Sequence, residues 1–223
     1  IPDDAQARHL LDLARDLGIN LIDTAPAYGV SEQRLGPLLL GQRDHWVVVS
    51  KVGEEFVDGQ SQFDFSPAHT RFSVERSLQR LKTDRIDLVL VHSDGRDLDI
   101  LQNSGVYETL AELKREGKIL GYGLSGKTVE GGLLALEQGD CAMVTYNLNE
   151  QAERPVLDYA QANAKGILVK KALASGHVCL KPDEDPVRLS FELLFSHPGV
   201  GAAIIGTINP QHLSANVRTA ASV

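Results

Sequence analysis

The hydrophobic positions of this chain form two kinds of segment that alternate along its length. Short, mostly apolar runs are typical of strands buried on both faces, and they are separated by stretches with apolar residues every three or four positions, which indicate amphipathic helices. The apolar runs read INLIDTA, HWVVVSKV, DLVLVHS, GYGLSG, AMVTYNL, GILVKKAL and AAIIGT. This alternation predicts an α/β fold with seven parallel strands covered by helices.

The first helical pattern begins beside two cap candidates, Asp3 and Asp4, and stops at Gly18. Its apolar stripe includes Leu10 and Leu17. The later helical patterns span roughly 31–42, 67–82, 106–117, 127–138, 152–164, 185–195 and 209–220. A helix is thus expected after every predicted strand.

Reactive side chains stand where the first three predicted strands end. Asp23, Lys51 and His92 close these runs, and Tyr28 follows Asp23 within a loop. A (β/α)8 barrel builds its active site at the carboxyl ends of its strands. An open nucleotide-binding sheet would instead need a glycine-rich loop after its first strand, and DTAPAYGVSE has the wrong spacing for one. We therefore predict a (β/α)8 TIM barrel, with its first strand missing before Ile1.

Composition narrows the class of protein. The chain is 43% hydrophobic, and no stretch resembles a linker, so residues 1–223 are expected to form a single domain. A net charge of −8 without a Lys/Arg cluster argues against nucleic-acid partners, and the apolar runs are too short to cross a membrane. Cys141 and Cys179 have no metal-binding spacing, so we expect two free thiols, a cytoplasmic location and no metal site.

Four segments carry a family resemblance. They are GINLIDTAPAYGVSEQRLG, VVVSKVG, SVERSLQRLKTDRIDLVLVHSDG and IIGTINPQHLSANV. Together they resemble the successive motifs of the aldo-keto reductases, and the likeness covers nearly the whole chain. The resemblance implies NAD(P)H-dependent reduction of a small aldehyde or ketone to an alcohol.

The four residues at the strand ends suit that chemistry. Hydride transfer to a carbonyl builds negative charge on its oxygen, and a nearby acid must supply a proton. We expect Tyr28 to be this acid, with the Lys51 ammonium lowering its pKa and Asp23 keeping Lys51 charged. A neutral imidazole from His92 is expected to bind and orient the carbonyl oxygen.

The family likeness also implies a nucleotide site near the C-terminus. Gly206, Thr207 and Asn216 match the segment that holds the adenosine phosphate, whereas His212 stands where Arg or Gln is usual. A helix starting near Asn209 would direct its N–H groups toward a phosphate, although an ordinary helix cap would look the same. NADP(H) is the expected cofactor, and NAD(H) stays open.

The expected nicotinamide contacts depart from the family pattern. Ser125 matches a carboxamide-binding serine, but Gly126 replaces the usual Asn, Met143 a Gln and Lys170 an aromatic residue. Lys170 or Lys171 could reach the pyrophosphate or simply point outward. The loop that ends by Pro186 is also short, so we expect weaker retention of the cofactor and slow turnover.

Two other functions remain open at this point. The first is a Schiff-base aldolase or decarboxylase that uses Lys170 or Lys51 as its amine nucleophile. The second is a module that binds a nicotinamide nucleotide, as a redox sensor or docking domain, with little turnover.

Overall fold

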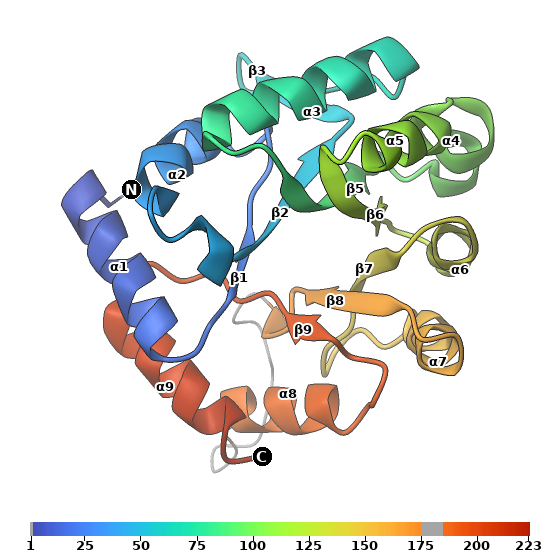
Figure 1. Cartoon of the computed structure of the whole chain (residues 1–223). Coiled ribbons are helices and arrows are strands. Elements are labelled where there is room, and N and C mark those ends of the chain that lie inside the picture. The colour runs from blue at the N-terminus through green and yellow to red at the C-terminus, as the bar shows by residue number, and fades with distance from the viewer. Residues whose placement is uncertain (1, 175–184) are drawn as a thin grey trace. The chain divides into compact units, whose positions relative to one another are not determined.

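The computed structural model describes residues 2–174 and 185–223, which form two compact units. The central unit is Asn20–Met143. The terminal unit combines the described residues of 1–19 with those of 144–223. Figure 1 shows the elements of both units.

The central unit is built on parallel strands in the order β1, β2, β5, β6 and β7. Their pairing places Asp23 opposite Val49, and Lys51 opposite Leu90. The strands are β1 (Leu21–Asp23), β2 (Val47–Val52), β5 (Ile86–His92), β6 (Ile119–Ser125) and β7 (Cys141–Thr145), whose last two residues belong to the terminal unit. Because the strands run parallel, their carboxyl ends lie along one edge of the sheet.

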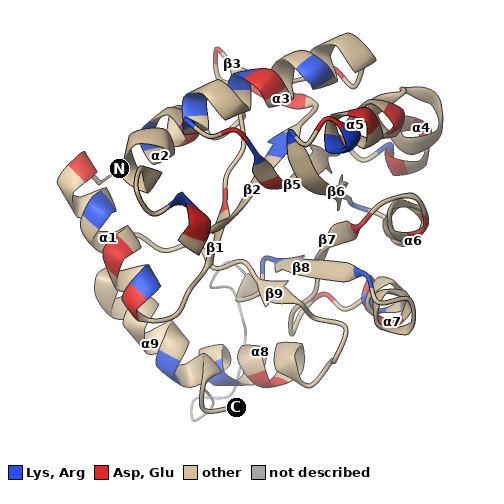
Figure 2. Cartoon of the chain, in the orientation of Figure 1, with Lys and Arg blue, Asp and Glu red and all other residues tan. Residues whose placement is uncertain are grey.

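Helices pack on this sheet through an apolar core. They are α2 (Ser31–Leu39), α3 (Pro67–Leu81), α4 (Asp97–Asn103), α5 (Val106–Arg115) and α6 (Val129–Gln138), with a short 3-10 helix at Arg43–His45. Gly36 lets α2 approach α3 closely, since a Cβ there would lie 2.2 Å from the carbonyl oxygen of Arg80. Figure 2 shows both signs of charge along the helices and few charges on the strands, as expected for strands buried on both faces.

The terminal unit contains two parallel strands and four helices within its described residues. The strands are β8 (Gly166–Lys170) and β9 (Ala202–Ala203), paired through Leu168 and Ala202. The helices are α1 (Asp4–Asp16), α7 (Arg154–Ala162), α8 (Pro186–Phe195) and α9 (Pro210–Ala220). Asp3 caps α1 through a reciprocal pair of hydrogen bonds with Gln6, so the cap expected there is confirmed.

The strand and helix predictions are largely confirmed. Each of the seven apolar runs contains one parallel strand, and each predicted helix is present with boundaries moved by a few residues. The α/β class is therefore established. Closure into an eight-stranded barrel, a missing first strand and a single domain over 1–223 stay predictions.

Besides the short 3-10 helix at Arg43–His45, two features were not predicted. One is α4, a helix of seven residues. The other is an antiparallel hairpin of β3 (Glu54–Val57) and β4 (Gln60–Phe63), which turns at Asp58 and Gly59. Both turn residues have positive φ, 51° and 79°, as a two-residue hairpin loop requires. The Asp-Gly pair was the available signal for this hairpin.

The structure bears on one of the two cysteines and on the expectation that no segment crosses a membrane. Cys141 is a free, buried thiol, and burial raises its pKa to about 12, so it is unreactive at neutral pH. Cys179 and most of the loop before Pro186 lie outside the described residues. Among the helices that the structure describes, none is long and apolar enough to cross a bilayer.

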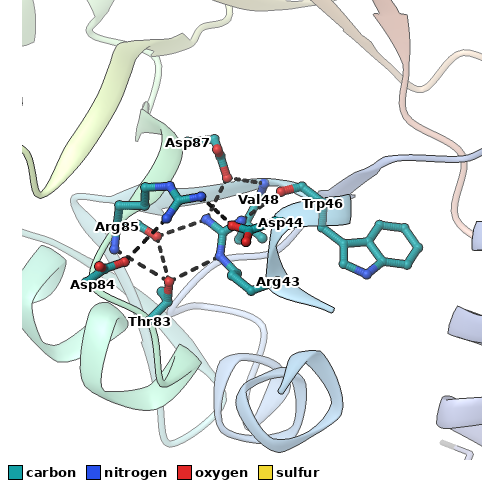
Figure 3. A network of polar contacts seen from close by, with 8 residues as sticks. All are labelled: Arg43, Asp44, Trp46, Val48, Thr83, Asp84, Arg85 and Asp87. Atoms are coloured by element: carbon teal, nitrogen blue, oxygen red, sulfur yellow. Dashed lines mark hydrogen bonds and ion pairs between the residues drawn. The ribbon is translucent and has the colours of Figure 1, made fainter. Parts of the chain in front are cut away.

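Arg43 ties together the starts of β2 and β5 (Figure 3). Its side chain is 15% exposed and pairs with Asp87, which also accepts a hydrogen bond from the backbone N–H of Val48. The guanidinium donates to the carbonyl oxygens of Trp46 (2.7 Å) and Arg85 (2.9 Å), the carboxylate of Asp87 (2.6 Å) and the hydroxyl of Thr83 (3.2 Å). These contacts lie at the amino ends of the strands, where a barrel fold places stabilising residues.

We expect Arg43→Lys to destabilise the protein by about 2 kcal/mol, because an ammonium cannot serve four acceptors in this planar arrangement. Urea unfolding followed by circular dichroism measures the loss. Arg115→Lys, at an exposed position on α5, is the matched control and should change little. An equal effect of the two substitutions would contradict the role given to Arg43.

Candidate active site

Three neighbouring strands of the central unit bring Asp23, Lys51 and His92 to the same edge. Asp23 and His92 end β1 and β5, and Lys51 is the penultimate residue of β2. Tyr28 lies in the loop after β1, where its backbone N–H donates to the carbonyl oxygen of Ala25 (3.0 Å). The four residues predicted to carry proton transfer are therefore close together within one unit.

The Lys51 ammonium is buried and held by two oxygen atoms. Only 2% of Lys51 is exposed, and its Nζ donates to Asp23 Oδ1 (2.6 Å) and to the carbonyl oxygen of Thr24 (3.0 Å). Burial lowers the pKa of Lys51 below its usual value, while the attraction of Asp23 acts in the opposite direction. Asp23 thus stabilises the charged form of Lys51 and fixes the position of Nζ.

Tyr28 lies between Lys51 and His92. The Lys51 Nζ is 4.8 Å from the centroid of the Tyr28 ring, and the Tyr28 and His92 rings meet edge to face with centroids 6.3 Å apart. Although 46% of Tyr28 is exposed, partial burial raises its pKa to about 12, with further contributions from Asp23 and Glu54. The expected lowering of this pKa by Lys51 is wrong for the structure described, because burial raises the pKa and the carboxylates of Asp23 and Glu54 raise it further. Tyr28 is consequently fully protonated at neutral pH.

Glu54 is a fifth member of this cluster that the sequence analysis missed. Its Oε2 lies 2.5 Å from His92 Nδ1, and its Oε1 accepts a hydrogen bond from Ser61 on β4 (2.6 Å). Both Glu54 and His92 are largely buried, with side chains 14% and 24% exposed. The hairpin, whose turn the Asp-Gly pair could have predicted, brings this carboxylate to the site.

A third carboxylate supports the site from α2. Glu32 is completely buried and accepts a hydrogen bond from the Ser50 hydroxyl (2.7 Å), next to Lys51 in the chain. Arg80 on α3 lies 3.3 Å from its other carboxylate oxygen. Glu32 therefore joins α2, β2 and α3 behind Lys51 and also acts to raise the pKa of Lys51.

The structure gives a physical reason for Gly126. A Cβ at this position would lie 2.9 Å from Asp97 Oδ2 and 2.9 Å from a methyl group of Leu124. Asp97 is buried, and its Oδ2 accepts three hydrogen bonds of 2.8 Å from Lys127 and Thr128. The glycine thus provides the space that this carboxylate occupies.

The other two residues expected around the nicotinamide within this unit lie at the ends of neighbouring strands. Ser125, which is 2% exposed, is opposite His92 in the pairing of β5 and β6. Met143 is also 2% exposed and pairs with Ser125 from β7. Their contact with a cofactor stays a prediction.

The remaining predicted cofactor residues lie in the terminal unit. Lys170 ends β8, Gly206 and Thr207 precede α9, and His212 and Asn216 lie on that helix. The start of α9 is an ordinary cap, in which Asn209 Oδ1 accepts from the N–H groups of Gln211 (2.8 Å) and His212 (3.4 Å). These N–H groups were expected to bind a phosphate, but they already donate to Asn209. An anion at this helix end could therefore be attracted only by the helix dipole and by nearby side chains.

Comparison with known proteins decides the family. The sequence model of the aldo/keto reductase family matches residues 2–186. The chain belongs to this family. Membership confirms the resemblance noted in the sequence and makes the protein an oxidoreductase of the carbonyl-reducing class.

Known relatives cover most of the chain. A solved structure from Pseudomonas aeruginosa, described as a candidate aldo-keto reductase, is 75% identical with a TM-score of 0.94 and covers 100% of this chain and 84% of its own. An uncharacterised Bacillus subtilis oxidoreductase is 28% identical over 96% of this chain and 82% of its own length. A D-threo-aldose 1-dehydrogenase from a Pseudomonas species is 32% identical over 78% of this chain, which spans 61% of that relative.

We expect Gly126→Ala to destabilise the protein by about 1–3 kcal/mol, because the added methyl group would press on Asp97 and Leu124. Thermal unfolding measures the effect. The control is Gly206→Ala, where a Cβ would meet no atom within 4 Å and φ is not in the left-handed region. If both variants were as stable as the parent, Asp97 would have moved aside at little cost, and the space at Gly126 would not be required.

Proposed function

We propose that this aldo-keto reductase reduces a small aldehyde or ketone to an alcohol with NADPH or NADH, using Tyr28 as the general acid. The observation that carries the proposal is the cluster of Asp23, Tyr28, Lys51 and His92 within a chain of this family. The substrate is proposed only as a class, although one relative is named as an aldose dehydrogenase. We also propose that residues 1–223 act as one domain in the cytoplasm.

The residues of the cluster divide the proton chemistry. A bound nicotinamide would supply the hydride, which adds to the carbonyl carbon. The Tyr28 hydroxyl gives its proton to the carbonyl oxygen, and a pKa of about 12 keeps that proton in place until the oxygen becomes strongly basic. The Lys51 ammonium, held by Asp23, then stabilises the tyrosinate that this transfer leaves behind.

The cofactor would be held by residues that fit it in part. Ser125 is proposed to bind the carboxamide, and Lys170, Gly206, Thr207, His212 and Asn216 the phosphates and adenosine. Gly206 leaves open space beside the backbone, which suits close approach of a nucleotide, and the capped start of α9 still offers its positive dipole end. We place NADP(H) first and leave NAD(H) open.

The alternatives are less well supported. A Schiff-base nucleophile should be a neutral amine, yet Lys51 forms a 2.6 Å ion pair with Asp23. One observation still supports a nucleotide-binding module with little turnover: Gly126 and Met143 replace residues that usually orient the nicotinamide. Turnover assays on a carbonyl panel at saturating cofactor separate this module from an enzyme.

Tyr28→Phe should abolish carbonyl reduction and change cofactor affinity by no more than a few-fold, because the hydroxyl donates a proton but contributes little to nucleotide binding. NADPH oxidation on an aldehyde panel and fluorescence titration with NADPH measure the two properties. Tyr159→Phe on α7 is the control and should retain activity. Loss of cofactor binding in Tyr28→Phe would assign Tyr28 to the nucleotide site instead.

Lys51→Met should be equally inactive, since no cation would then stabilise the tyrosinate and the Asp23 carboxylate would lose its ammonium partner. Circular dichroism checks that the variant folds. Borohydride reduction of the parent with a carbonyl substrate should leave no adduct on Lys51 or Lys170. A stable adduct found by mass spectrometry would favour the Schiff-base enzyme.

A further inference from the structure

Glu54 is held in place from both sides of its hairpin. Its Oε1 accepts the hydrogen bond from Ser61, and its Oε2 lies 2.5 Å from His92 Nδ1. The next residue, Glu55, points to the opposite face of the strand, where it contacts the Arg76 guanidinium and lies 3.5 Å from His69 Nε2 on α3. The hairpin is thus fastened to α3 by Glu55 and presents Glu54 to His92.

The position of Glu54 restricts the protonation of His92. If a neutral His92 carries its proton on Nδ1, Nε2 is only an acceptor and cannot donate to a carbonyl oxygen. Glu54 Oε2 lies 2.5 Å from Nδ1 without hydrogen-bond geometry, so the carboxylate acts on the ring through its charge. That charge favours the imidazolium, which also keeps an N–H on Nε2.

The charges of the cluster favour the same protonation state. Asp23 and Glu54 bring two negative charges, and Lys51 brings one positive charge. Among the described residues, the titratable and charged groups at the strand ends around His92 include Asp23 from β1, Tyr28 from the following loop, Lys51 from β2 and Glu54 from β3, while Ser125 of β6 is uncharged. Lys51 opposes a second cation, but Asp23 already neutralises Lys51, so Glu54 is left to pair with His92.

We propose that Glu54 is a positioning residue that holds His92 as an imidazolium, and that this cation, rather than a neutral ring, donates the hydrogen bond to the substrate carbonyl oxygen. The inference rests on the proposed carbonyl reduction and deepens it. During hydride addition, Tyr28 gives up its proton, while His92 keeps both of its protons and stabilises the charge developing on oxygen. Reduction then requires His92 to be protonated.

The sign of the pH effect follows from the charge of Glu54. A carboxylate beside an imidazole raises the pKa of the imidazole, so the activity that needs imidazolium is present at low pH and is lost as pH rises through this pKa. Glu54→Gln removes the charge and should move this descending limb of kcat/KM to lower pH by about one unit. The pKa of Tyr28, about 12, lies above the pH range of these assays, so titration of Tyr28 does not produce the descending limb of kcat/KM.

Two measurements on the full chain test the proposal. NMR titration of the histidine Cε1–H signals, with His92 assigned from His92→Asn, gives its pKa in the parent and in Glu54→Gln without any turnover. Profiles of kcat/KM against pH with NADPH and an aldehyde give the functional limb. Asp58→Asn, which removes one charge at the exposed hairpin turn, is the matched control. Glu54→Asp keeps the carboxylate and should show a smaller shift of the His92 pKa than Glu54→Gln.

We expect Glu54→Gln to lose up to about tenfold in kcat/KM near pH 8 and to approach the parent near pH 6, where its His92 is still protonated. Asp58→Asn should follow the parent throughout. An unchanged titration of His92 in Glu54→Gln would overturn the pairing. Full activity of that variant at high pH would also overturn the proposal, because its amide can donate to Nδ1 and leave a neutral ring with an Nε2–H.

A failure of the proposed function would look different. The parent would then reduce no carbonyl compound on the panel, which removes the donor role of His92. The histidine titrations would still report whether Glu54 governs its charge. If instead the parent is active and the pKa of His92 is the same in Glu54→Gln as in the parent, only the role proposed for Glu54 is contradicted.

Discussion

The ammonium of Lys51 is buried to 2% exposure, and the arrangement of the site depends on how that charge is accommodated. An isolated ammonium in such a place would cost several kcal/mol and would tend to lose its proton. Asp23 at 2.6 Å and the Thr24 carbonyl at 3.0 Å satisfy it. These partners come from β1 and its loop, so the charge on β2 is stable only when both strands are correctly paired. The chemistry of the site and the pairing of the sheet thus depend on the same contact.

Around this ion pair, carboxylates outnumber ammonium groups. Burial raises the pKa of Tyr28, and Asp23 and Glu54 raise it further. A tyrosine in these surroundings keeps its proton for reduction, whereas the tyrosinate that the reverse reaction needs is scarcely populated at neutral pH. A protonated His92 would bring the cluster of Asp23, Lys51, Glu54 and His92 to a net charge of zero. The carbonyl oxygen would then meet donors that are already in place before charge develops on it.

The sequence was informative where local pattern and chemistry coincide. Asp23, Lys51 and His92 could be placed at strand ends because parallel strands are apolar throughout, so a polar residue stands out where each run stops. Glu54 was missed because its carboxylate reaches His92 only through a hairpin, and two successive glutamates resemble a solvated surface. The pKa of Tyr28 could not be judged from the sequence either, since it depends on burial and on the carboxylates of Asp23 and Glu54. Gly126 looked like a lost ligand because the carboxylate of Asp97, distant in the chain, cannot be seen in a local motif.

The contact between Gly126 and Asp97 also constrains how the chain can change over evolution. An asparagine at 126 would have to displace a carboxylate that caps α6 through Lys127 and Thr128. Replacing Asp97 first would leave those backbone N–H groups without their acceptor. Each single step therefore lowers stability, and only the paired change avoids the loss. The glycine and the aspartate are therefore coupled positions, and the asparagine usual in the family fits at 126 only when residue 97 changes as well.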